Sequence, residues 1–85
     1  MVNPEQAAAP YTDRQGQYLA FIYYYTKIHR RPPSQADMQS FFGVSPPSVH
    51  QMILTLEKLR FIERTPAQSR SLTLLLRRDQ LPDLL

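Results

Sequence analysis

The stretch GVSPPSVHQMILTLEKLRFIER, residues 43–64, constrains the fold of this chain more than any other. Gly43 can end one helix in the left-handed conformation, and Ser45 can cap the next helix with its hydroxyl. A proline costs little in the first turn of a helix, where the N–H groups have no partner inside the helix. The sequence therefore predicts a helix that begins at Pro46 or Pro47 directly after a tight turn.

This helix is predicted to end near Arg60 and to have one apolar side. Apolar residues recur along it at three- and four-residue spacing, at Val49, Met52, Ile53, Leu56 and Leu59. Such a period forms a single stripe, which we expect to face the core. The other faces, free to read a partner, carry Pro47, Ser48, His50, Gln51, Thr55 and Lys58.

An earlier helix is predicted from Asp13 to His29. Thr12 and Gln15 have the spacing of a capping box, and Asp13 suits the positive end of the helix dipole. The expected inner face carries Leu19, Ile22 and Thr26, joined by Tyr18 and Tyr25.

The aromatic run in this helix, Phe21 and Tyr23 to Tyr25, cannot point inward as a whole, because consecutive helix positions are about 100° apart. Either the exposed rings cover neighbouring loops, or they form a surface for self-association. A homodimer through this tyrosine-rich first helix is therefore one hypothesis for a partner.

Between these two helices, Pro32 and Pro33 end the first one and Ser34 can cap a short second helix that stops at Gly43. Its inward residues are expected to be Ala36 or Met38, together with Phe41 and Phe42.

After the third helix, β-prone residues predict a hairpin. A strand is expected to begin at Phe61 and Ile62, residues 65–69 with Pro66 form the tip, and residues 70–76 form the return strand. The fold class is thus mainly α with a small β-hairpin: three helices followed by a two-stranded antiparallel wing, which is a winged helix-turn-helix. We expect a domain over residues 12–76, a flexible arm over 1–11, and a tail over 77–85 that either covers the sheet or is mobile.

Charge is unevenly distributed along the chain. All ten basic residues lie between Thr12 and Arg78 with only four acidic ones, so this part carries +6 while the whole chain carries +3. A basic body is expected for a protein whose partner is a polyanion such as DNA.

Composition argues against several other classes of protein. The chain has no cysteine, and its two histidines, His29 and His50, are isolated, so we expect no metal and no cofactor. We also expect no small-molecule ligand and no enzyme, because the sequence has no acid/base cluster and no glycine-rich phosphate loop. No apolar run approaches the roughly 20 residues that span a membrane, and no signal peptide is recognisable, so a cytoplasmic location is expected.

From Thr12 to Leu76 the chain resembles the N-terminal DNA-binding domain of the LexA repressors. The resemblance is carried by TDRQ, RPPSQADM, FFGVSPPSVHQMILTLEKLRFIER and SRSLTLL. It implies a winged helix-turn-helix that reads a two-fold-related operator in double-stranded DNA, usually as a dimer.

Three departures from the family limit what the resemblance implies. The family's C-terminal peptidase domain, with its serine and lysine pair, has no room in 85 residues, so we expect no self-cleavage. The reading face differs from that of the best-known members, so their operator sequence cannot be transferred. Arg60 stands where members commonly have glycine, which predicts a left-handed residue or a differently shaped turn.

The leading hypothesis is a sequence-specific transcriptional regulator whose third helix, residues 46–60, lies in the major groove. The predicted base readers are Ser48, His50 and Gln51; the predicted backbone contacts are Ser34, Gln35, Thr55, Lys58 and Arg70. Gln51 suits base reading best, because its amide can pair with adenine N6 and N7. For each residue the alternative is a solvated surface position. The alternative function is a winged-helix module for protein interaction or dimerisation, which would lack a steep dependence on salt.

Overall fold

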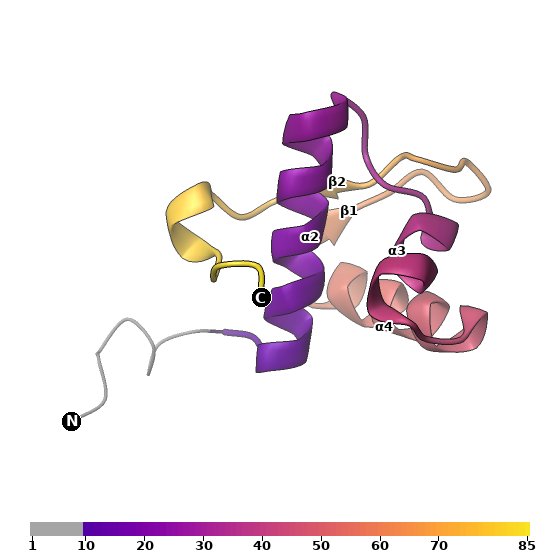
Figure 1. Cartoon of the computed structure of the whole chain (residues 1–85), viewed down its shortest axis with the longest axis horizontal. Coiled ribbons are helices and arrows are strands. Elements are labelled where there is room, and N and C mark those ends of the chain that lie inside the picture. Colours follow the sequence, from indigo (N-terminus) through magenta and orange to yellow (C-terminus); the bar gives the residue numbers. More distant parts are fainter. Residues whose placement is uncertain (1–9) are drawn as a thin grey trace.

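The computed structural model describes residues 10–85, which form three helices followed by a two-stranded antiparallel sheet (Figure 1). The helices are α2 (Asp13–His29), α3 (Gln35–Phe42) and α4 (Pro46–Lys58). The strands are β1 (Ile62–Glu63) and β2 (Thr73–Leu74), and a 3-10 helix, η1 (Arg78–Gln80), follows them. The expected fold class is confirmed: the chain is mainly helical and has the order of a winged helix.

Helix α2 has the predicted bounds because both of its ends are fixed locally. The Thr12 hydroxyl accepts from the Gln15 backbone nitrogen at 3.1 Å, and the Gln15 side chain accepts from the Thr12 nitrogen at 3.0 Å. At the other end Arg30 adopts a left-handed conformation, with φ of 59°, and its N–H donates to the Thr26 carbonyl. The predicted capping box is therefore confirmed.

The turn between α3 and α4 also forms as predicted. Gly43 ends α3 with φ of 64°, and Ser45 caps α4 by accepting from the Ser48 nitrogen at 3.3 Å. Helix α4 ends two residues earlier than predicted, at Lys58, since Arg60 is left-handed with φ of 64°. The left-handed residue that the family's glycine implied at this position is thus present.

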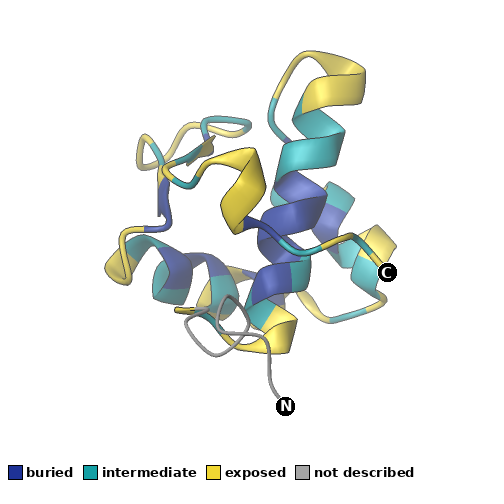
Figure 2. Ribbon diagram, turned by 90° about the vertical axis from the view of Figure 1, so that its left-hand side faces the viewer, coloured by how far each residue is buried: buried dark blue, intermediate teal, exposed yellow. Residues whose placement is uncertain are grey.

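The core lies where α2 crosses the other elements, and Figure 2 shows the buried stretch in the middle of this helix. Tyr18 stacks on Phe42 of α3 with ring centroids 4.1 Å apart. The largest fully buried side chains come from all layers: Tyr18, Leu19, Ile22, Pro33, Met38, Val49, Ile53, Leu56 and Ile62. Each should stabilise the domain by about 1.5 to 3 kcal/mol through its removal from water.

Two expected core positions, Leu59 and Phe41, are wrong, whereas the expectation of Ala36 or Met38 in α3 is confirmed for Met38. Leu59 is 46% exposed because it lies after the end of α4, where the apolar stripe no longer continues. Phe41 is 47% exposed, although one of its faces stacks on Phe21 with centroids 4.5 Å apart. In α3 it is Met38 that is buried, while Ala36 is exposed.

The wing, residues 61–76, has a much shorter ladder than predicted. Only the pairs Ile62 with Leu74 and Glu63 with Thr73 are in register, and the Leu75 N–H adds one bond to the Phe61 carbonyl at 2.9 Å. The wing tip, residues 65–69, is closed instead by the Ser71 hydroxyl, which accepts from the Thr65 nitrogen at 2.9 Å. The predicted return strand over residues 70–76 is therefore wrong in length.

The tail, residues 77–85, packs on the side of α2 opposite α3 and α4 (Figures 1 and 2). Leu81 is buried, and the Gln17 side chain donates to the Asp83 carbonyl at 3.0 Å and accepts from the Leu85 nitrogen at 2.8 Å. The tail thus covers α2 and not the sheet.

The predicted arm mostly lies outside the described residues. Its last residue, Tyr11, packs edge-on against Phe61 at 6.1 Å, and its hydroxyl donates to the Gln80 carbonyl. Among residues 10–85, no helix is both long and apolar enough to cross a membrane.

Candidate nucleic-acid interface

Helix α4 carries an exposed face directly opposite its buried stripe. Val49, Ile53 and Leu56 are fully buried. At about 100° per residue, the direction away from them is that of Gln51 and Lys58, which lie two turns apart on one line and are both exposed. Gln51 therefore occupies the centre of the outward face, as a residue that enters a groove must.

The other two predicted base readers flank this line. By the same helical geometry Ser48 lies on the side of α4 toward the first turn of α2, and His50 lies on the opposite side. Ser48, Gln51 and Thr55 line an open groove together with Gln15 of α2. The predicted readers thus share one end of the helix but span more than one face of it.

Two hydroxyls on this helix are already engaged. The Ser48 hydroxyl shares a hydrogen bond with the Ser45 hydroxyl at 2.9 Å, and the Thr55 hydroxyl donates to the Gln51 carbonyl at 2.9 Å. Phosphate oxygens only accept hydrogen bonds, so Thr55 would have to leave its helix carbonyl to donate to one. Lys58 is exposed, and its ammonium group can donate hydrogen bonds to a phosphate.

A second groove of about 370 Å³ lies between the first turn of α3 and the wing tip, with Ile53 of α4 among its lining residues. Ser34 and Gln35 line one wall. The first N–H groups of a helix have no partner inside it, and they suit an anionic oxygen. The backbone at Gln35 and Ala36 is therefore available to a phosphate beside the wing.

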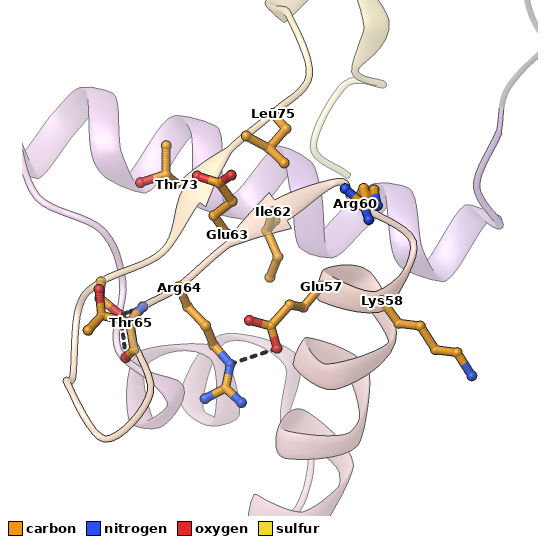
Figure 3. A pocket seen from close by; sticks show the side chains of 10 residues that line it. Glu57, Lys58, Arg60, Ile62, Glu63, Arg64, Thr65, Thr73 and Leu75 are labelled. Carbon is orange, nitrogen blue, oxygen red and sulfur yellow. Dashed lines mark hydrogen bonds and ion pairs between the residues drawn. The ribbon is translucent and has the colours of Figure 1, made fainter.

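The acidic residues of α4 and α3 are neutralised by arginines of the wing. Arg64 follows β1 directly and donates from its Nε to the Glu57 carboxylate of α4 at 3.2 Å, as Figure 3 shows. Glu57, Lys58 and Arg64 border one groove, and the Lys58 side chain extends away from the other two (Figure 3). The pairing removes the repulsion that Glu57 would exert on a polyanion.

Arg70, the predicted wing contact, turns toward the protein. Its Nη1 lies 2.9 Å from the Asp37 carboxylate, 3.1 Å from the Tyr25 hydroxyl and 3.2 Å from the Pro32 carbonyl. Its contact with DNA stays a prediction, whereas the structure shows its three hydrogen bonds within the domain.

The environment of Asp37 favours its charged form. The hydrogen bond from the Ser34 backbone N–H is the main cause that lowers the pKa of the Asp37 carboxyl from 3.8 to about 2. The side chains of Ser34 and Tyr25 and the charge of Arg70 lower it further, and burial opposes them. Asp37 is thus a permanent anion at neutral pH.

The pairing of Asp37 and Glu57 with wing arginines was missed by the sequence reasoning. A capping box of Ser34 and Asp37 could have been read from the S-x-x-D spacing, as it was for Thr12 and Gln15. Nothing in the sequence indicates the partner Arg70, 33 residues away. Over residues 10–85, no group of three or more His, Cys, Asp or Glu side chains could hold a metal ion.

Comparison with known proteins identifies relatives. The family model of the LexA DNA binding domain matches residues 8–71. The LexA repressor of Thermosipho africanus (strain TCF52B) is 38% identical over 66 residues, which are 78% of this chain and 33% of that protein. The LexA repressor of Thermosipho melanesiensis (strain DSM 12029 / CIP 104789 / BI429) is 33% identical over 70 residues, 82% of this chain and 35% of that protein. The chain spans about a third of the length of these curated relatives.

Proposed function

The chain belongs to the LexA DNA-binding domain family, and from this premise we propose that it is a transcriptional regulator that reads a specific sequence in double-stranded DNA. One observation carries the proposal. The second helix of the helix-turn-helix, α4, turns an exposed polar face outward while its opposite face is fully buried. A helix held in this way by one face can lie in the major groove with the other.

The proposed base readers are Ser48, His50 and Gln51. Gln51 has the central part, since its amide carries both a donor and an acceptor for the edge of adenine. Ser48 and His50 flank it and would reach neighbouring base pairs on either side.

Backbone contacts are proposed for both ends of this surface. Lys58, at the last turn of α4, would meet a phosphate at the rim of the groove, with Thr55 nearby. Ser34 and Gln35, at the first turn of α3, would hold a second phosphate through the Ser34 hydroxyl and the Gln35 N–H, because the Ser34 N–H already donates to Asp37. Arg70, the backbone contact expected from the wing, is paired with Asp37 beside this surface.

A homodimer would let two copies read a two-fold-related site. We propose the tyrosine-rich face of α2 for this contact, because Tyr23 and Tyr24 are only partly covered. Their cover is Arg78 of the tail, which donates to the Tyr24 hydroxyl at 2.7 Å and lies over both rings. Pairing through this face would therefore require Arg78 either to move away or to become part of the contact between the two copies.

Selection from random duplex DNA tests the proposal. We expect a preferred sequence to be enriched, and its affinity to fall steeply with salt because phosphate contacts release counterions. A pool that stays random after several rounds, with no salt-dependent duplex binding, would favour the alternative, a winged-helix module for protein interaction.

A further inference from the structure

Arg70 joins three separate parts of the domain through a single nitrogen. Its Nη1 donates toward Tyr25 near the C-terminal end of α2, toward the carbonyl of Pro32 in the turn after α2, and toward Asp37 in α3. All three acceptors lie outside the wing. The arginine therefore attaches the wing to α2 and α3, while the Arg64–Glu57 pair attaches it to α4.

The Asp37 carboxylate serves two purposes at once. The same oxygen, Oδ2, that accepts from Arg70 also accepts from the Ser34 backbone nitrogen at 2.8 Å and so closes the cap of α3. The side chains of Arg70 and Asp37 are 31% and 28% exposed. A charge-assisted bond in such a half-buried position is stronger than an ion pair in open solvent.

The strand ladder of the wing is too short to fix the direction of the wing tip by itself. Only two residues on each strand are paired, and a two-stranded hairpin is at best marginally stable alone. Arg70 also has a left-handed backbone, with φ of 55°, a conformation that is strained for an L-residue. Backbone strain of this kind persists where surrounding contacts hold it in place.

We propose that Arg70 and Asp37 are positioning residues that hold the wing tip at a set distance from α4, so that both can lie on one duplex. The inference rests on the proposed function and deepens it. Arg70 then acts through Asp37 and not through a phosphate. The wing tip, residues 65–69, contains no charged side chain, so its own contacts with DNA would be neutral hydrogen bonds.

The direction in which one substitution changes the DNA affinity distinguishes this positioning role from a simple effect of charge. Asp37→Asn removes a negative charge next to the interface, which by charge alone would strengthen DNA binding. The asparagine amide still offers an oxygen to the Ser34 N–H, so the cap of α3 is kept. The same amide oxygen carries no full charge, so its bond to Arg70 loses its charge-assisted strength, and weaker DNA binding by this variant indicates a loosened wing.

The experiment compares wild type, Asp37→Asn, Arg70→Ala, the double variant and Lys58→Ala on two duplexes that contain the selected sequence. One duplex is long enough to lie under the wing, and the other is trimmed at the recognition-helix footprint. We expect Asp37→Asn and Arg70→Ala each to lose about tenfold on the long duplex and little on the short one. The double variant should lose no more than either single variant, and all three should keep the wild-type salt slope.

Lys58→Ala is the reference for a lost phosphate contact, with a salt slope reduced by about one. If Arg70→Ala behaves in the same way while Asp37→Asn binds as well as wild type, Arg70 contacts a phosphate and the proposal is wrong. Losses that are equal on both duplexes, or that multiply in the double variant, also overturn it.

Backbone NMR relaxation of the free protein tests the proposal without DNA. Residues 65–69 should become more mobile in Asp37→Asn and Arg70→Ala but not in Lys58→Ala, while α3 keeps its helical signals. If the mobility of residues 65–69 is unchanged in both variants, Arg70 and Asp37 do not hold the wing tip. If the wild-type protein binds no duplex, the proposed function is wrong. A wing tip that is more mobile in the two variants than in wild type would still show that Arg70 and Asp37 hold it.

Discussion

The Asp37 carboxylate of α3 lies 2.9 Å from the Arg70 guanidinium of the wing, although 33 residues separate them in the sequence. The same carboxylate closes the cap of α3, so one titratable group supports two elements. Its pKa of about 2 in the folded domain compares with 3.8 for an ordinary aspartate.

This difference predicts a loss of stability in acid. A group whose pKa is lower in the folded state contributes stability above its unfolded pKa and loses it as pH falls through the folded pKa. The contribution of Asp37 should thus be complete above about pH 5 and disappear between about pH 4 and 2. Urea unfolding measured across this range should show a decline in the free energy of unfolding that is shallower in Asp37→Asn. Equal slopes for the two proteins would contradict the assigned role.

Gly16 should resist substitution by alanine. In an open helix Gly→Ala gains about 0.5 to 1 kcal/mol. Here a Cβ would lie 2.8 Å from a ring carbon of Tyr11 and 3.1 Å from Pro82, so the side chains that cover α2 would have to move. We expect Gly16→Ala to lower the melting temperature and to raise hydrogen exchange in the tail. A rise in melting temperature would show that these contacts are loose.

In the turn after α4, by contrast, glycine should be more favourable than the residue that is present. Arg60 is left-handed and exposed, a conformation that glycine adopts without strain. Arg60→Gly should therefore stabilise the domain by up to about 1 kcal/mol, the relief of strain being partly offset by the freer unfolded chain. Arg60→Ala is the control, because it removes the same side chain and keeps the strain. If both variants change the denaturation midpoint equally, strain is not the cause.

Pairing of two copies is tested by the spacing of half-sites. If the protein dimerises on DNA, two half-sites about one helical turn apart should bind more tightly than one. Tyr24→Ala, in the face proposed for pairing, should remove that advantage and leave the affinity for a single half-site unchanged. Equal affinity of the wild-type protein for one and two half-sites would refute the dimer.

On α4, Gln51 should contact a base and Lys58 should contact the DNA backbone. Gln51→Ala should cost about 1 to 3 kcal/mol on the preferred duplex and relax the preference at one base position. Lys58→Ala should weaken binding to all sequences and reduce the salt slope by about one. Titrations of both variants against preferred and scrambled duplexes measure these effects. A core control, Ile53→Ala, should lose about 2 to 5 kcal/mol of stability and bind nothing because it unfolds.

The helices could be predicted from the sequence because their ends are fixed by neighbours. Thr12, Ser34 and Ser45 each bond to a residue three positions later, and Gly43 needs no partner to turn left-handed. Capping chemistry of this kind is local, so a single sequence contains it. The apolar stripe of α4 was predicted for the same reason and failed only at Leu59, beyond the helix end.

The wing and the tail could not be predicted because distant residues decide them. The short ladder of β1 and β2 depends on Ser71 and Arg70, whose partners lie in other elements or across the tip. The packing of Leu81 on the domain likewise has no local signal. The site was predictable only where it lies on α4, since helical geometry alone places Gln51 and Lys58 on one line.

The most direct test of the account is the affinity of the wild-type protein for its selected duplex and for a scrambled one, measured across a range of salt concentrations. We expect both affinities to fall with salt, since both include phosphate contacts, and the selected duplex to bind at least about a thousandfold more tightly at physiological salt. Equal affinity for the two duplexes, or binding that does not depend on salt, would contradict the reading of DNA by α4.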